Sequence, residues 1–172
     1  YCTYRILCGR GRLRIRLAFK ESAFYTLLML EGEKRMAKEI WKAGNMLYPV
    51  PPVLVSCRNK KGESNLLTVA WAGTVCSTPP MLSISVRAER YSHPMIVESG
   101  EFVVNLPTEG LVRETDEAGV RSGKDMDKWE TLHLHKEEGT VLSTPMIQEC
   151  PVNMECKVRQ ILPLGSHELF IA

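Results

Sequence analysis

Short apolar segments with the spacing of β-strands follow one another from residue 53 onward. Residues 53–57 are a continuous apolar run rich in β-branched side chains, and a polar, turn-forming stretch around Gly62 closes it at residues 58–65. Apolar residues resume at 66–72, so the two runs predict a hairpin. Residues 81–87 alternate apolar and polar side chains, which predicts a strand with one buried face.

The rest of the chain mixes short strands with small helices. Further strands are expected at residues 101–106, 154–162 and 167–172. Helices are expected at residues 94–99, 108–118 and 125–132, the second with Thr108 as its N-cap and with Leu111 and Val112 facing inward. Strands and helices do not alternate regularly, so the pattern predicts a mainly β fold in which five or six antiparallel strands form a barrel.

The first 35 residues differ in character from the rest. They carry 8 Lys and Arg against 3 Glu, whereas residues 36–172 carry 14 against 17, so the two parts have net charges of +5 and −3. A basic tract followed by an apolar one is the order of a targeting peptide, although no small-x-small cleavage site follows Leu30. Alternatively, residues 1–35 are translated upstream DNA, because Gly32-Glu33 can be encoded by a purine-rich ribosome-binding sequence just before Met36. We therefore treat residues 1–35 as an N-terminal extension and residues 36–172 as the domain.

The sequence allows a structural prediction at each end of this domain. Residues 36–47 form either a short helix or an extended arm before Pro49. The chain ends at Ala172 within an apolar run, so we expect the domain to be truncated at its C-terminus and one barrel strand to lack its partner.

Composition excludes several classes of protein. The 172 residues are 44% hydrophobic and 24% charged, which is globular composition, and no apolar run reaches the about 20 residues of a membrane span. The mildly acidic domain argues against nucleic acid as a partner. Six cysteines without regular spacing are typical of free thiols in a reducing cell, so a cytoplasmic location is expected. His133 and His135 lack a third ligand nearby, so no metal site is predicted.

Residues 65–92 contain the most informative candidates for chemistry. Ala70, Ala72 and Gly73 have small side chains or none and leave the backbone of this strand uncovered. A flat ligand can therefore approach the main-chain N–H and C=O groups there. Beyond them Ser85 and Arg87 share one face of a strand, and Arg90 and Ser92 follow in the next loop. Hydroxyl and guanidinium groups near a helix start can bind a phosphate monoester; alternatively, they are the solvated face of an ordinary barrel strand.

The same segment resembles the flavin reductase-like, FMN-binding split-barrel proteins, most closely the flavoredoxin branch. The resemblance extends over residues 36–172. It is carried by the segments Ser77-Thr78-Pro79-Pro80, Glu89-Arg90-Tyr91-Ser92, 100–106, 119–123, Asp127-Lys128 and 165–167. It implies a six-stranded antiparallel Greek-key split barrel that forms a homodimer and binds FMN without covalent attachment at or near the subunit interface. The family's C-terminal segment has no counterpart here, and Ala118 stands where relatives often have Cys.

The resemblance also assigns cofactor contacts. It places Asn65 and Trp71 along the flavin, the backbone of Thr74, Val75 and Cys76 along the isoalloxazine edge, Ser92 at the phosphate, and Lys128 and His167 at further FMN contacts. The residues themselves leave alternatives open: Asn65 as a turn residue, Trp71 as core, Lys128 as a solvated helix charge paired locally, and His167 as structural. Cys76 has no basic neighbour in the sequence to activate it as a redox thiol, and no catalytic side chain is assigned.

The predicted function follows from this resemblance. The protein is expected to be an FMN-dependent oxidoreductase that takes hydride from NADH or NADPH and passes electrons to a flavin or a redox protein. No Gly-x-Gly-x-x-Gly motif is present, so the nicotinamide nucleotide would bind transiently as a co-substrate. Two alternatives remain: a non-catalytic FMN electron carrier that exchanges electrons with partner proteins, and a barrel that serves only protein contact.

Overall fold

The structure is a computed structural model that describes residues 5–7 and 38–172 of the chain. It divides into two units, residues 1–48 and 49–172. In the first unit β1 (Arg5–Leu7) pairs antiparallel with β2 (Lys38–Ile40). Residues 41–47 form neither helix nor strand, so the helix expected as one alternative for residues 36–47 is wrong. Most of the predicted extension lies outside the described residues, and its boundary at residue 35 stays a prediction.

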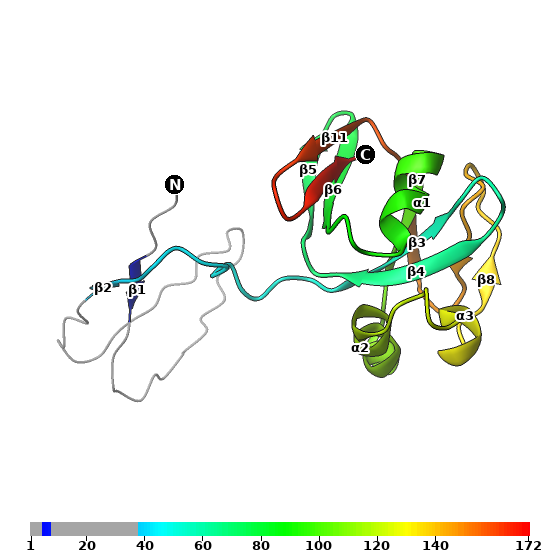
Figure 1. Ribbon diagram of the computed structural model, residues 1–172, viewed down its shortest axis with the longest axis horizontal. Helices are drawn as coiled ribbons and strands as arrows, with labels where there is room; N and C mark the ends of the chain where they lie inside the picture. Colours follow the sequence, from blue (N-terminus) through cyan, green and yellow to red (C-terminus); the bar gives the residue numbers. More distant parts are fainter. Residues whose placement is uncertain (1–4, 8–37) are drawn as a thin grey trace, which may run out of the picture. The chain divides into compact units, whose positions relative to one another are not determined.

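Two antiparallel four-stranded sheets build the second unit (Figure 1). The first sheet has the order β10 (Val152–Lys157), β7 (Glu101–Leu106), β3 (Val53–Arg58) and β4 (Ser64–Val69). The second has the order β11 (Gln160–Pro163), β12 (Glu168–Ile171), β6 (Pro80–Val86) and β5 (Ala72–Ser77). The predicted hairpin is confirmed as β3 and β4, which pair from Val53 with Val69 to Arg58 with Ser64. Because the two sheets are separate ladders, the mainly β architecture is a split barrel, as predicted.

These sheets contain eight strands, two more than expected for this part of the chain. The segment expected as one strand at 66–72 ends at Val69, and a bend at Ala70 and Trp71 carries the chain into the other sheet as β5. The segment expected at 154–162 likewise divides into β10 and β11. Strand β5 escaped prediction because its sequence, Ala-Gly-Thr-Val-Cys-Ser, has no apolar alternation to mark it.

Strand β12 does not lack a partner. It pairs with β6 on one side, with Phe170 opposite Ile84, and with β11 on the other, with Phe170 opposite Ile161. The final strand of this sequence is thus paired on both sides, whereas the expectation of a truncated domain in which one barrel strand lacks its partner stays a prediction.

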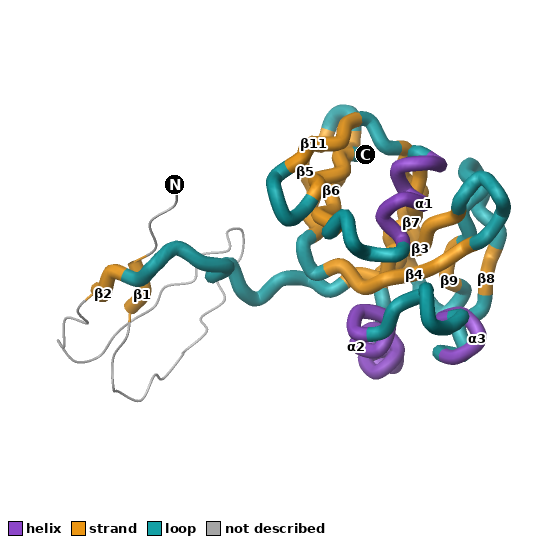
Figure 2. Tube along the Cα trace, in the orientation of Figure 1, coloured by secondary structure: helices purple, strands orange, loops and turns teal. Residues whose placement is uncertain are grey.

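The core consists of two apolar clusters on opposite faces of the first sheet. Val53, Val55 and Cys57 of β3 join a cluster with residues of β6, β12 and α1 (Ser92–Ser99). Leu54 points to the other face, where α2 (Val112–Val120) and α3 (Lys128–Thr131) cover it. Figure 2 shows α1 apart from α2 and α3, which lie together beyond β4. A strand buried on both faces explains why residues 53–57 are apolar without alternation.

The helices differ from the expected ones at their starts. The helix expected at 94–99 begins at Ser92, and the one expected at 108–118 is a 3₁₀ turn (Glu109–Leu111) followed by α2. The side chain of Thr108 makes no capping hydrogen bond. Leu111 packs against the second cluster, but Val112 is 65% exposed, so its inward placement is wrong.

Helix α3 and a small ribbon complete the unit. Asp127 caps α3 by accepting hydrogen bonds from the backbone N–H groups of Trp129 and Glu130. Strands β8 (Lys136–Glu137) and β9 (Met146–Ile147) pair antiparallel beside it. Across residues 5–7 and 38–172, no helix has the length and apolar character needed to cross a membrane, and no group of three or more His, Cys, Asp and Glu side chains is placed to hold a metal ion.

Candidate functional site

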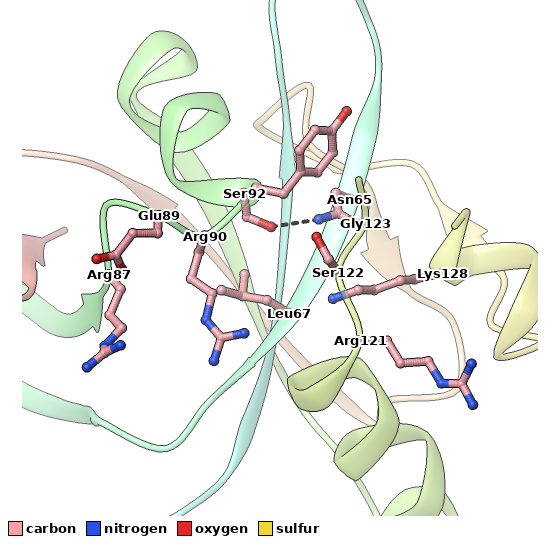
Figure 3. A pocket seen from close by; sticks show the side chains of 11 residues that line it. Asn65, Leu67, Arg87, Glu89, Arg90, Ser92, Arg121, Ser122, Gly123 and Lys128 are labelled. Atoms are coloured by element: carbon pink, nitrogen blue, oxygen red, sulfur yellow. Dashed lines mark hydrogen bonds between the residues drawn. The ribbon is translucent and has the colours of Figure 1, made fainter. Parts of the chain in front are cut away.

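A cavity of about 440 Å³ opens where three segments of the second unit meet (Figure 3). Strand β4 forms one wall, the loop from β6 to α1 forms another, and the segment after α2 forms the third. The residues that line it are Asn65, Leu67, Arg87, Glu89, Arg90, Tyr91, Ser92, Arg121, Ser122, Gly123 and Lys128. Five of the sequence-predicted site residues are among them: Asn65, Arg87, Arg90, Ser92 and Lys128.

Asn65 and Ser92 form the buried polar floor of this cavity. The Asn65 Nδ2 donates a hydrogen bond of 2.8 Å to the Ser92 Oγ, and the two residues are 4% and 1% exposed. The Ser92 oxygen accepts this bond, and its hydroxyl also hydrogen-bonds with the buried Cys57 thiol, so a ligand in the cavity would compete with Cys57 for the hydroxyl proton. Asn65 is thus not merely a turn residue, since it lies in β4 and orients a hydroxyl group 27 residues further along the chain.

Gly123 closes the third wall against Asn65. A Cβ atom at position 123 would lie 2.3 Å from the Asn65 Oδ1 and 2.5 Å from its Nδ2. No side chain fits there without displacing the carboxamide that holds Ser92. The close approach of backbone to side chain explains why glycine occupies this position.

Lys128 is the buried cation of the site. It is the first residue of α3, is 3% exposed, and donates from Nζ to the carbonyl oxygens of Leu66 at 2.9 Å and Ala118 at 2.7 Å. Burial lowers the pKa of its ammonium group from 10.5 to about 8, and the positive charge of Arg90 contributes in the same direction. The alternative of a solvated charge paired locally is wrong, since no ion pair of Lys128 exists among the described residues. One N–H remains to bind a ligand.

Arginine side chains add positive charge around this centre. Arg90 donates to the carbonyl oxygen of Gly119 at 3.2 Å, and Arg121 forms an ion pair of 3.4 Å with Glu117. Among the described residues neither Arg87 nor Arg90 has a carboxylate partner. Four cationic side chains therefore line the cavity against one carboxylate, that of Glu89. Such an excess of positive charge attracts an anion.

Trp71 and His167 form an aromatic pair near these arginines. Their ring centroids are 4.6 Å apart with an interplanar angle of 37°. Burial lowers the pKa of His167, and the charges of Arg87 and Arg90 lower it further while Glu89 opposes them, so the pair lies within electrostatic reach of the cavity lining. Trp71 is 39% exposed and belongs to neither apolar cluster, so the core alternative for it is wrong.

The remaining predicted site residues do not line the cavity. Thr74, Val75 and Cys76 lie on β5, an edge strand of the second sheet, with Val75 50% exposed at an irregularity in the pairing with β6. The backbone N–H of Ser85 donates to the carbonyl oxygen of Trp71 at 2.9 Å, and its side chain is half-buried away from the cavity lining. Arg87 lines the cavity and Ser85 does not, and strand β6 ends between them, at Val86.

Six cavity residues were not among the candidates: Leu67, Glu89, Tyr91 and the consecutive residues Arg121, Ser122 and Gly123. In Figure 3 the Ser122 hydroxyl and the Lys128 amino group point into the same space as the Ser92 hydroxyl, whereas the Arg121 guanidinium lies at the margin. Arg-Ser-Gly directly after a helix was a signal for them, because it combines a cation, a hydroxyl and a residue that permits close backbone approach. A second cavity of about 370 Å³ adjoins the first and shares Asn65, Tyr91, Gly123 and Lys128 with it.

Comparisons with known proteins give the class of this site. Residues 45–172 match the model of the flavin reductase like domain, so the chain belongs to the flavin reductase-like family. The structure is similar to flavoredoxin of Desulfovibrio vulgaris (Miyazaki F), with a TM-score of 0.72 and 32% identity over 78% of this chain and 72% of that one.

Two further relatives support the same membership. Flavoredoxin from Methanosarcina acetivorans is 35% identical with a TM-score of 0.69, over 77% of this chain and 71% of that chain. An uncharacterised protein of Archaeoglobus fulgidus is 34% identical over 136 residues, which cover 79% of this chain and 76% of the relative. The resemblance to the flavoredoxin branch is thereby confirmed.

Proposed function

We propose that this protein is an FMN-binding oxidoreductase. In this proposal the bound flavin takes electrons from NADH or NADPH and passes them to a flavin or a redox protein. Membership of the flavin reductase-like family and the similarity to flavoredoxins support an oxidoreductase with a flavin cofactor. The use of a nicotinamide nucleotide as electron donor, and the identity of the electron acceptor, belong to our proposal.

One observation carries the choice of cofactor: the cavity combines unpaired cations with an oriented hydroxyl group. Lys128, Arg87 and Arg90 have no carboxylate partner among the described residues, and the Ser92 hydroxyl, which Asn65 orients, lines the same cavity. A phosphate monoester dianion, which FMN has and riboflavin lacks, fits this donor set. Ser92 and Lys128 would hold the phosphate group, and Asn65 would hold Ser92.

The flavin ring requires a flat surface. The rings of Trp71 and His167, together with the edge strand β5, would offer one, and His167 lies within electrostatic reach of Arg87 and Arg90. Bound FMN supplies the capacity to accept a hydride and release electrons. The contribution of this chain is electrostatic: Arg87, Arg90 and Lys128 create a positive field that favours anionic groups in and beside the cavity.

Two further parts of the proposal concern the assembly and its location. We infer a homodimer with the flavin at or near the interface, as the resemblance implies, and a cytoplasmic protein. The cysteines described in the second unit, Cys57, Cys76, Cys150 and Cys156, are free thiols, which is consistent with a reducing compartment.

The similarity to proteins named flavoredoxins also favours a second candidate function, a non-catalytic FMN electron carrier. Anaerobic mixing of the FMN-loaded protein with NADH or NADPH distinguishes the two. Rapid loss of the flavin absorption band is expected for the reductase. A band that persists with both nucleotides, but is lost with dithionite, would contradict the reductase and support the carrier.

A further inference from the structure

Glu168 contacts both ends of the loop that forms one wall of the cavity, one end through its backbone and the other through its carboxylate. In the β6–β12 ladder Glu168 lies opposite Val86, the residue directly before Arg87. Its carboxylate Oε2 is 2.8 Å from the Nε2 of His93, the residue directly after Ser92. Because a carboxylate only accepts, the imidazole donates this hydrogen bond. The loop 87–92 therefore begins and ends at the same glutamate.

The contact between Glu168 and His93 also joins the two sheets. Helix α1, which contains His93 as its second residue, packs against β3, β4 and β7 of the first sheet, whereas Glu168 belongs to β12 of the second sheet. The His93 ring meets Phe170 of β12 edge-on at a centroid distance of 5.5 Å, and its side chain is only 12% exposed. The hydrogen bond between Glu168 and His93 is thus partly buried, so water screens its electrostatic interaction less than that of a surface ion pair.

Within the loop the backbone turns twice. The N–H of Arg90 donates to the carbonyl oxygen of Arg87 at 3.1 Å, and the N–H of His93 donates to that of Arg90 at 2.9 Å. Arg90 also donates to the carbonyl oxygen of Gly119, and Asn65 donates to Ser92, so both tie the loop to the first sheet and α2. The backbone pairing of Glu168 with Val86 sets where the loop begins. The carboxylate of Glu168 ties its other end, at His93, to the second sheet, and so contributes to where Ser92 stands relative to Asn65 on β4.

We propose that Glu168 and His93 are positioning residues that hold the loop 87–92 in the geometry that binds a phosphate group. The proposal rests on the proposed function, because the phosphate is that of FMN. Neither residue lines the cavity, so their side-chain contact acts through Ser92, the residue beside His93. A ligand with a phosphate group should therefore depend on the pair, and the same ring system without phosphate should not.

The test compares FMN with riboflavin in the full chain. In the variant Glu168→Ala we expect FMN affinity to fall by about tenfold and riboflavin affinity by less than about threefold. Glu168→Gln keeps the length and a hydrogen-bonding group, so its FMN affinity should return to within about threefold of the original. Glu168 is 31% exposed on its side chain, which makes these replacements compatible with folding.

Glu149→Ala is the matched control. Glu149 accepts hydrogen bonds from the ring and backbone of His135, and neither residue lines the cavity, so its loss should leave both affinities unchanged. Equal losses for FMN and riboflavin in Glu168→Ala, or no loss for either, would overturn the positioning role. If the original protein fails to bind FMN at all, the proposed function falls instead, and the positioning role falls with it. Thermal unfolding of each variant shows whether a loss arises from unfolding.

Discussion

The backbone of Gly123 lies so close to the carboxamide of Asn65 that a methyl group at position 123 would stand 2.3 Å from Oδ1. We therefore expect Gly123→Ala to push Asn65 away from Ser92 and to disorder the floor of the cavity. The expected loss is about 1–3 kcal/mol in the free energy of unfolding, as for other overpacked sites, together with weaker FMN binding. Chemical denaturation and a fluorescence titration with FMN measure the two effects.

Gly110→Ala is the control for this substitution. A Cβ at position 110 meets only the Thr108 Oγ1 at 3.7 Å, an ordinary contact. This variant should keep the original FMN affinity. If Gly123→Ala binds FMN as well as Gly110→Ala does, the cavity floor does not need the arrangement of Asn65 and Ser92 described above.

Removal of the Ser92 hydroxyl should affect binding and stability together. In Ser92→Ala the buried Nδ2 of Asn65 loses its partner, and the phosphate loses a donor. We expect FMN affinity to weaken by about 1–3 kcal/mol while riboflavin affinity stays the same, and the free energy of unfolding to fall by about 1–2 kcal/mol. Calorimetric titration with both ligands measures the first effect. An unchanged preference for FMN over riboflavin would exclude Ser92 from the phosphate site.

Lys128 should make the stability of the protein depend on pH in the alkaline range. Its pKa is about 8 in the folded chain and 10.5 in its ordinary state, so between these values the unfolded chain binds more protons than the folded one. The free energy of unfolding therefore rises with pH across that window, by on the order of 1–2 kcal/mol from this residue.

The variant Lys128→Met removes the titrating group and keeps an unbranched side chain. Denaturation at pH 8 and at pH 10 should show a rise in the original protein that is smaller or absent in the variant. Equal pH dependence in the two proteins would mean that Lys128 is not desolvated as its contacts with Leu66 and Ala118 indicate.

The sequence predicted the elements whose signal is local. The hairpin of β3 and β4, the strand β7 and the first helix follow from apolar runs and the turn around Gly62. Strand β5 has no such signal, because small and polar residues at a sheet edge need not alternate.

The site was predictable in its residue types but not in its geometry. Asn65 and Ser92 are 27 residues apart, and His93 and Glu168 are 75 apart, so neither contact leaves a pattern in the sequence. The burial of Lys128 is equally non-local, since Leu66 and Ala118 supply its partners from two other elements. Family resemblance indicated Asn65, Ser92 and Lys128 but not His93 or Glu168, and tertiary packing determines how all five act.

Titration of the purified, full-length chain with FMN and with riboflavin tests the central claim most directly. The account predicts that FMN saturates the protein at one molecule per chain, perturbs the flavin absorption bands, and binds at least about tenfold more tightly than riboflavin because of its phosphate. A protein that stays colourless after incubation with excess FMN and gel filtration, or that binds the two flavins equally, would contradict it.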